Sequence, residues 1–150
     1  AAFGCQVYAY SRTTKDLPGV TFTDLDTLLS TCDIVSLHVP ATPQTHHLIN
    51  AEKLALMKPT ALLINTARGP VVDSQALADA LNSGRLAGAG IDVFEMEPPV
   101  PADHPLLTAK NVLATPHVAF ATAQSMEKRA VLVCDNLKAW LDGKPIHQIC

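Results

Sequence analysis

The feature that most constrains the fold is a regular alternation of short apolar runs with segments of helical periodicity. Runs that suit buried strands cover residues 6–10, 33–40, 61–65, 88–93 and 111–115. Apolar residues at helical spacing follow Thr23, Asn50 and Asp73 and fill 122–141. Parallel strands need crossover helices of this kind, because after each strand the chain must return to the end of the sheet at which the next strand begins. We therefore predict a doubly wound parallel α/β sheet in a single domain.

Local signals mark where several of these helices begin. The segment 23–26, Thr-Asp-Leu-Asp, has the form of a capping box and predicts a helix that starts after Thr23. Asn50 is expected to cap the next helix, and either Asp73 or Ser74 the one after it. The helix starts thus agree with the periodicity.

Two later segments differ in character. The prolines between 98 and 105 predict a stiff, non-helical loop. The longest helix, 122–141, carries an apolar stripe that includes Met126 and Trp140. We predict that this stripe packs in the core.

Composition excludes several classes of function. The net charge of −3 offers no concentrated basic face for nucleic acid or an anionic membrane. No apolar run approaches the roughly 20 residues of a membrane span. The four cysteines are far apart with no CxxC pair, and no HExxH pattern occurs. We expect reduced, mostly buried thiols in a cytoplasmic protein and no metal site.

A guanidinium follows one of the predicted strands. The run 61–65 ends abruptly in Thr66-Ala67-Arg68-Gly69-Pro70, which is typical of a turn. In open α/β sheets the carboxyl ends of strands face the ligand crevice, and Arg offers a fork of donors matched to a carboxylate. Arg68 is therefore a candidate for substrate contact, although it could instead tether its own loop or face solvent.

Polar residues follow two further strands. Asp92 begins a stretch that includes Glu95 and Glu97, and His117 follows the last strand. A doubly wound sheet places such strand ends along one edge, so we expect these groups to converge with Arg68. Imidazole titrates near neutral pH, and an adjacent carboxylate would favour its protonated form. His117 is thus a candidate acid/base; taken singly, it could be a structural histidine and Glu97 a solvated loop charge.

Three segments resemble the signature motifs of the D-isomer-specific 2-hydroxyacid dehydrogenases. They are INTARG at 64–69, DVFEMEPP at 92–99 and TPHVA at 115–119, in matching order and spacing. The resemblance extends over essentially all 150 residues, as a Rossmann-like NAD(P)-binding domain. It implies hydride transfer between NAD(P)H and a 2-oxo acid or D-2-hydroxy acid, of the glyoxylate/hydroxypyruvate reductase or phosphoglycerate dehydrogenase type. The alternative is an NAD(H)-sensing, corepressor-like interaction protein of the same fold.

The resemblance also implies residue roles. Arg68 would orient the substrate carboxylate, His117 would exchange a proton with the substrate oxygen, and Glu97 would be the partner of His117. The coenzyme cleft would involve, besides Arg68 and His117, residues His38, Val39, Pro40, Thr45, Thr66, Ala67, Asp92 and Ala119. The family further suggests a small 2-oxo or 2-hydroxy acid as substrate and a homodimer as the assembly.

The residues after the first predicted strand bear on the choice of coenzyme. An acidic residue there usually holds the ribose 2′-hydroxyl of NAD, whereas an arginine can accept the 2′-phosphate of NADP. This chain has Ser11, Arg12 and Thr13 at that place and no acid. We predict a preference for NADPH; alternatively, Arg12 lies over the adenine and both coenzymes are accepted.

The chain lacks the G-x-G-x-x-G turn that cradles a pyrophosphate. Residues 1–5 look like the last turn of a helix closed by Gly4, so we expect the first strand and its turn to lie upstream. By family resemblance we also expect a substrate domain that is not present in this chain. The first strand is central in the usual order, and its two neighbours would lose a partner. We expect the 150 residues alone to bind dinucleotide poorly and to be inactive.

Overall fold

The computed structural model describes residues 4–13, 15–96 and 99–148. The chain divides into two compact units, Ala1–Pro116 and His117–Cys150, and each is described by itself. That residues 1–150 act as one coenzyme-binding domain therefore stays a prediction.

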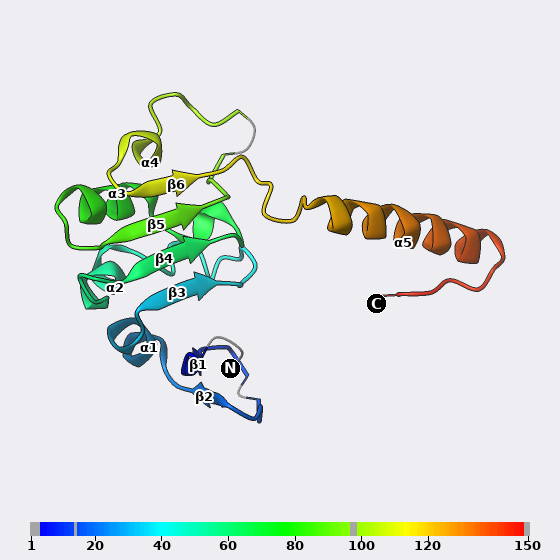
Figure 1. Ribbon diagram of the computed structural model, residues 1–150, viewed down its shortest axis with the longest axis horizontal. Coiled ribbons are helices and arrows are strands. Elements are labelled where there is room, and N and C mark those ends of the chain that lie inside the picture. The colour runs from blue at the N-terminus through cyan, green and yellow to red at the C-terminus, as the bar shows by residue number, and fades with distance from the viewer. Residues whose placement is uncertain (1–3, 14, 97–98, 149–150) are drawn as a thin grey trace. The chain divides into compact units, whose positions relative to one another are not determined.

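A four-stranded parallel sheet forms the centre of the first unit (Figure 1). Its strands, in spatial order, are β3 (Ile34–Leu37), β4 (Leu62–Asn65), β5 (Gly88–Ile91) and β6 (Val112–Ala114). The register pairs Leu37 with Asn65, Asn65 with Ile91 and Ile91 with Ala114. All four strands thus end in one row, which confirms the predicted parallel α/β sheet.

Two further strands form a separate parallel pair. These are β1 (Val7–Ala9) and β2 (Val20–Phe22), and Val7 is opposite Val20. No ladder within the described ranges joins this pair to β3. The sequence did not predict β2, whose three residues are too few for a clear alternation.

Three helices pack in succession against one face of the sheet. They are α1 (Leu25–Thr31), α2 (Ala51–Leu56) and α3 (Ser74–Asn82). The core joins inward strand residues such as Val35 and Leu63 to helix residues such as Leu77. On the opposite face Ile34 and Leu113 are 62% and 72% exposed, so one face of the sheet is covered and the other is open within the described unit.

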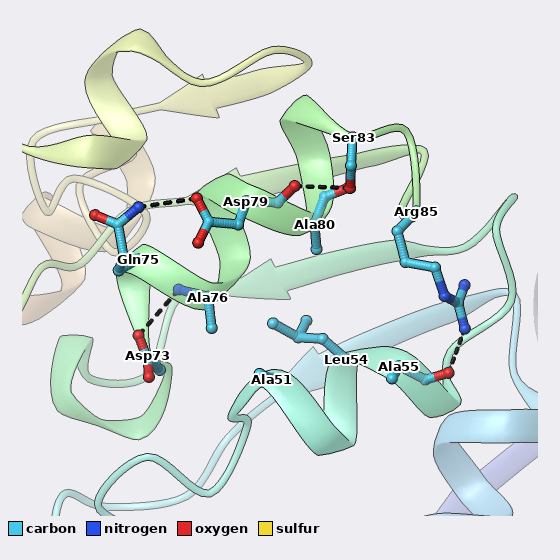
Figure 2. Close-up of a pocket in the computed structure, with 10 residues that line it drawn as sticks. All are labelled: Ala51, Leu54, Ala55, Asp73, Gln75, Ala76, Asp79, Ala80, Ser83 and Arg85. Carbon is cyan, nitrogen blue, oxygen red and sulfur yellow. Dashed lines mark hydrogen bonds between the residues drawn. The ribbon is translucent and has the colours of Figure 1, made fainter.

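Side-chain caps fix the start of each of these helices. The Oδ1 atom of Asn50 accepts the Lys53 N–H at 3.0 Å, as predicted. The cap of α3 is Asp73, whose Oδ1 accepts the Ala76 N–H at 3.0 Å (Figure 2). Helix α1 follows Thr23 as predicted, but its cap is Asp24 and not Thr23, the first residue of the capping-box pattern. Asp24 takes that position because its carboxylate reaches both the backbone N–H and the hydroxyl of Thr27.

Two short helical turns complete the first unit. The 3₁₀ turn η1 (Gly69–Val71) follows Arg68, and α4 (Pro105–Thr108) precedes β6. The prediction of a non-helical loop through Pro105 is therefore wrong at its last residue. Proline is well suited to the first turn of a helix, where its missing N–H costs no hydrogen bond.

The second unit contains α5 (Ala123–Leu141), the longest helix. Thr122 and Ser125 form a reciprocal capping box at its start. The predicted core packing of its apolar stripe is wrong for this chain, since Met126 and Trp140 are 46% and 66% exposed and the helix has no buried residue. The described part of this unit offers α5 no second helix or strand to pack against.

Other general expectations have mixed outcomes. Cys5 and Cys134 are exposed and Cys32 is partly buried, which contradicts the expectation of mostly buried thiols. Within the described ranges, no helix combines the length and apolar character needed to span a membrane. No cluster of three or more potential metal ligands was found there either.

Candidate functional site

The segments that follow β3 and β4 enclose a groove at the carboxyl edge of the sheet. Its volume is about 400 Å³, and it is lined by His38, Val39, Pro40, Thr66, Ala67 and Arg68. The groove forms here because Leu37 and Asn65, the last residues of the two strands, are paired neighbours. The structure thus brings together six residues that the sequence analysis assigned to one cleft.

Asn65 holds the turn that carries Arg68. The Asn65 side chain is buried, its Oδ1 accepts the Ala67 N–H at 3.1 Å, and its Nδ2 donates to the Arg68 carbonyl at 3.0 Å. Both bonds fix the backbone rather than a ligand. Sequence reasoning missed this residue, although an asparagine at the start of a turn often bonds the backbone two residues on.

Arg68 itself is exposed at the mouth of the groove. One Nη1–H donates to the carbonyl of Ala67 at 2.6 Å, so part of the side chain does tether its own loop. A guanidinium carries several further N–H donors arranged as a planar fork. The observed bond therefore leaves donor capacity for an incoming carboxylate.

The turn after Arg68 lies directly on the loop after β5. A Cβ atom added at Gly69 would be 1.9 Å from the carbonyl carbon of Phe94 and 2.4 Å from the nitrogen of Glu95. Those neighbours are backbone atoms and cannot rotate away. Only glycine allows the two loops to approach this closely.

Asp92 occupies the next position along the row of strand ends. Its backbone N–H donates to the Asn65 carbonyl at 3.0 Å, and its carboxylate accepts the Thr115 hydroxyl at 2.5 Å. Asp92 is only 3% exposed, so it is part of the buried floor of this edge. Thr115, which the sequence analysis did not single out, links the ends of β5 and β6.

Comparison with known proteins decides the family. The NAD-binding domain of the D-isomer specific 2-hydroxyacid dehydrogenases matches residues 1–119. The chain belongs to this dehydrogenase family. A glyoxylate reductase of Thermofilum pendens is 56% identical over 128 residues, which are 85% of this chain and 38% of that protein. The chain therefore spans well under half the length of this relative.

Solved structures of the family have the same fold. A D-lactate dehydrogenase with NAD⁺ from Lactobacillus jensenii superposes with a TM-score of 0.88 at 33% identity, over 99% of this chain and 49% of that one. A D-isomer specific 2-hydroxyacid dehydrogenase of Xanthobacter autotrophicus in complex with NADPH and MES gives 0.80 at 41% identity, over 98% and 61%. The fold is thus that of the family's coenzyme-binding domains.

Other residues that the sequence analysis assigned to the coenzyme lie outside the groove. The Thr45 hydroxyl donates to the Pro40 carbonyl at 2.6 Å and accepts the Thr42 N–H at 2.8 Å, so it shapes the turn after β3. Ser11, Arg12 and Thr13 follow β1 in an exposed turn in which the Ser11 hydroxyl donates to the Thr13 carbonyl. Their contact with coenzyme stays a prediction.

The other two predicted members of the catalytic triad have a different status. Glu97 lies outside the described residues. His117 begins the second unit, where its ring meets Phe120 edge-on at 6.1 Å between centroids, and Arg129 lies over the same Phe120 ring at 5.5 Å. Ala119 is in this unit too. The convergence of His117 with Arg68 therefore stays a prediction.

A second groove, between α2 and α3, holds none of the predicted site residues (Figure 2). Its volume is about 520 Å³, and much of its lining is alanine. Several of its polar groups bond within the fold, since Gln75 donates to Asp79 at 2.9 Å and Arg85 Nη2 donates to the Ala55 carbonyl, while Arg85 Nη1 is buried without a hydrogen-bond partner among the described residues. The smaller groove at the strand ends is the better candidate, because it combines a guanidinium with the edge at which α/β sheets bind ligands.

Proposed function

We propose that this chain is the coenzyme-binding part of an enzyme that reduces a small 2-oxo acid, such as glyoxylate, with NADPH. The observation that carries the proposal is the groove at the carboxyl edge, with Arg68 at its mouth. The glyoxylate reductase named above supports the choice of substrate class.

The groove fits one part of a dinucleotide. Val39, Pro40 and Ala67 provide apolar walls, whereas His38, Thr66 and Arg68 provide polar groups at its rim. This combination suits the nicotinamide end, and the sequence contains no G-x-G-x-x-G turn for the pyrophosphate. When bound, the nicotinamide supplies the hydride.

The residues of the chain would bind, orient and exchange a proton. Arg68 would hold the substrate carboxylate through paired N–H bonds and so fix the oxo carbon for attack. In reduction, protonated His117 would donate its proton to the substrate oxygen as negative charge develops there. Glu97 would stabilise the charged imidazole of His117. In oxidation, His117 would take the proton back.

The first test is an assay of the protein that carries this chain, with NADPH against a panel of 2-oxo acids. Replacing His117 with Ala should lower kcat by about 10²-fold or more, the usual contribution of a general acid, while coenzyme still binds. Near-normal turnover in this variant would remove His117 from the role. Coenzyme binding without turnover on any oxo acid would favour the NAD(H)-sensing alternative.

The preference for NADPH rests on Arg12 and on the absence of an acid after β1. Solved relatives include complexes with NAD⁺ and with NADPH, so the family accepts either coenzyme. The measurement is the ratio of kcat/KM for NADPH to that for NADH, which should exceed one and should fall in Arg12→Ala. A ratio at or below one in the unaltered protein defeats the preference.

Assembly and location extend the same proposal. The family resemblance favours a homodimer. The cysteine spacing favours a cytoplasmic protein, and the net charge and hydropathy disfavour a nucleic-acid or membrane partner. Light scattering on the purified protein measures its mass, and a monomer at working concentration would contradict the dimer.

A further inference from the structure

A glutamate and a histidine close the base of the loop between β5 and α4. Glu95 Oε2 and His104 Nε2 are 3.1 Å apart, and their side chains are 31% and 10% exposed. The two residues are nine positions apart, so their contact brings the ends of the segment 95–104 together. Glu97 lies between them in the sequence.

Both ring nitrogens of His104 are used in this arrangement. Nδ1 accepts the Leu106 N–H at 3.3 Å, where His104 caps α4. A nitrogen that accepts carries no hydrogen, so the ring hydrogen is on Nε2 and is donated to the Glu95 carboxylate. The Phe94 ring meets the His104 ring edge-on at 5.1 Å and limits its rotation. The contact is therefore a directed hydrogen bond from the Nε2–H of His104 to the Glu95 carboxylate.

The other oxygen of Glu95 reaches a different element. Oε1 accepts the N–H of Ser74, the first residue of α3, at 3.3 Å. Burial by itself would raise the pKa of the Glu95 carboxyl, but the hydrogen bonds from Ser74 and His104 outweigh it and hold the pKa below its ordinary value. Glu95 thus stays ionised and binds two elements at once.

The segment that Glu95 binds through Ser74 is the continuation of the Arg68 turn. Gly69 lies directly against the backbone of Phe94 and Glu95, and only two residues separate the end of η1 from the start of α3. Its amides close back on the turn, because Val71 N–H donates to the Arg68 carbonyl at 3.3 Å and Val72 N–H to the Gly69 carbonyl at 3.1 Å. The turn is therefore held from both its ends.

We propose that Glu95 and His104 are positioning residues, which hold the loop after β5 against the turn after β4 and so set the place of the Arg68 guanidinium. This inference deepens the proposed function and rests on it. The pair touches neither the groove nor the reacting atoms, and it acts through the backbone of residues 69–74. A misplacement of about 1 Å in such a group can cost up to about 10²-fold in rate.

The kinetic test compares His104→Leu and His104→Gln in the protein that carries this chain. His104→Leu removes the donor to Glu95, and we expect kcat/KM for the oxo acid to fall about 10-fold or more while KM for the coenzyme stays unchanged. His104→Gln keeps an N–H donor and should restore part of the loss. The matched control is Asp33→Asn, which breaks the exposed Lys58–Asp33 ion pair at the opposite end of β3 and should leave kcat/KM unchanged.

The outcomes separate this inference from the proposed function. Equal kcat/KM in His104→Leu and the unaltered protein, or equal losses in the Leu and Gln variants, would overturn it. If the unaltered protein reduces no oxo acid, the proposed function fails, and hydrogen exchange then tests the pair by itself. Faster exchange at Val71 and Val72 in folded His104→Leu supports the positioning role, whereas unchanged exchange overturns it. Nitrogen NMR shifts that place the ring hydrogen on Nδ1 would overturn it as well.

Discussion

The two compact units use similar local signals and bury very different amounts of their side chains. Helix α3 has nine residues and buries Leu77 and Leu81, whereas α5 has nineteen residues and buries none. Both begin at a side-chain cap and both carry an apolar stripe. The difference is that α3 packs on α2 and on the core beneath it. An apolar stripe therefore predicts a helix, but not what covers it.

The largest effect should come from truncating matched leucines in the two helices. Leu77→Ala removes a fully buried side chain and should lower the free energy of unfolding by about 2–5 kcal/mol. Leu137→Ala, at a 55% exposed position of α5, should change it by less than about 0.5 kcal/mol. Urea denaturation measures both. Equal losses would show that the stripe of α5 is covered in the folded protein and would end the contrast.

Replacing each of two glycines with alanine should give a smaller difference in stability than the two leucine variants. One glycine lies against neighbouring backbone, and the other has only an unfavourable backbone conformation. Gly69→Ala forces a Cβ into the backbone of Phe94 and should cost about 3 kcal/mol, near the upper end for overpacking. Gly143→Ala meets no atom within 4 Å but has a φ of +69°, so only the left-handed penalty of about 1 kcal/mol applies. The comparison of the two melting curves is the measurement. A smaller loss at Gly69 than at Gly143 would refute the close approach of the two loops.

Removing the helix caps should have a smaller effect again. Asp73→Ala should cost about 1 kcal/mol of global stability, because α3 belongs to the packed unit. Thr122→Ala removes a cap of similar strength, but the loss should be confined to fraying at the first turn of α5. Amide hydrogen exchange distinguishes the two, since only Asp73→Ala should raise exchange across the β-sheet. If both variants raised hydrogen exchange at the sheet amides equally, the stability of the two units would be coupled.

The smallest effect is a pH dependence of stability, and it involves only the first unit. The pKa of Glu95 lies below its ordinary value of 4.5, because hydrogen bonds from Ser74 and His104 overcome the effect of burial. A lowered folded pKa stabilises the protein above the unfolded value, and this stabilisation is lost as the pH falls through the folded pKa. Glu95→Gln should therefore be less stable than the parent at pH 6, and the gap should narrow toward pH 3. If thermal melts showed the same stability difference between the parent and Glu95→Gln at pH 6 and at pH 3, the lowered pKa of Glu95 would be contradicted.

Much of the fold and part of the site follow from short-range pattern. Helical spacing and caps such as Asn50 predicted the covering helices, and the change from apolar to turn residues placed Arg68 at a strand end. Short elements were missed or misplaced: β2 has three residues, and α4 begins at Pro105 within a segment that otherwise favours a loop. Elements of only three or four residues are too short for a hydrophobic period to be recognised in the sequence.

The sequence by itself determined the order of strands and helices and the polar residues at the strand ends, since both depend on residues near each other in the chain. Only the tertiary structure decided that Gly69 lies against Phe94. It also decided that Glu95 joins Ser74 to His104 and that α3 is buried while α5 is exposed. Most of these contacts join residues far apart in sequence. They depend on which elements pack together, a choice that no local pattern contains.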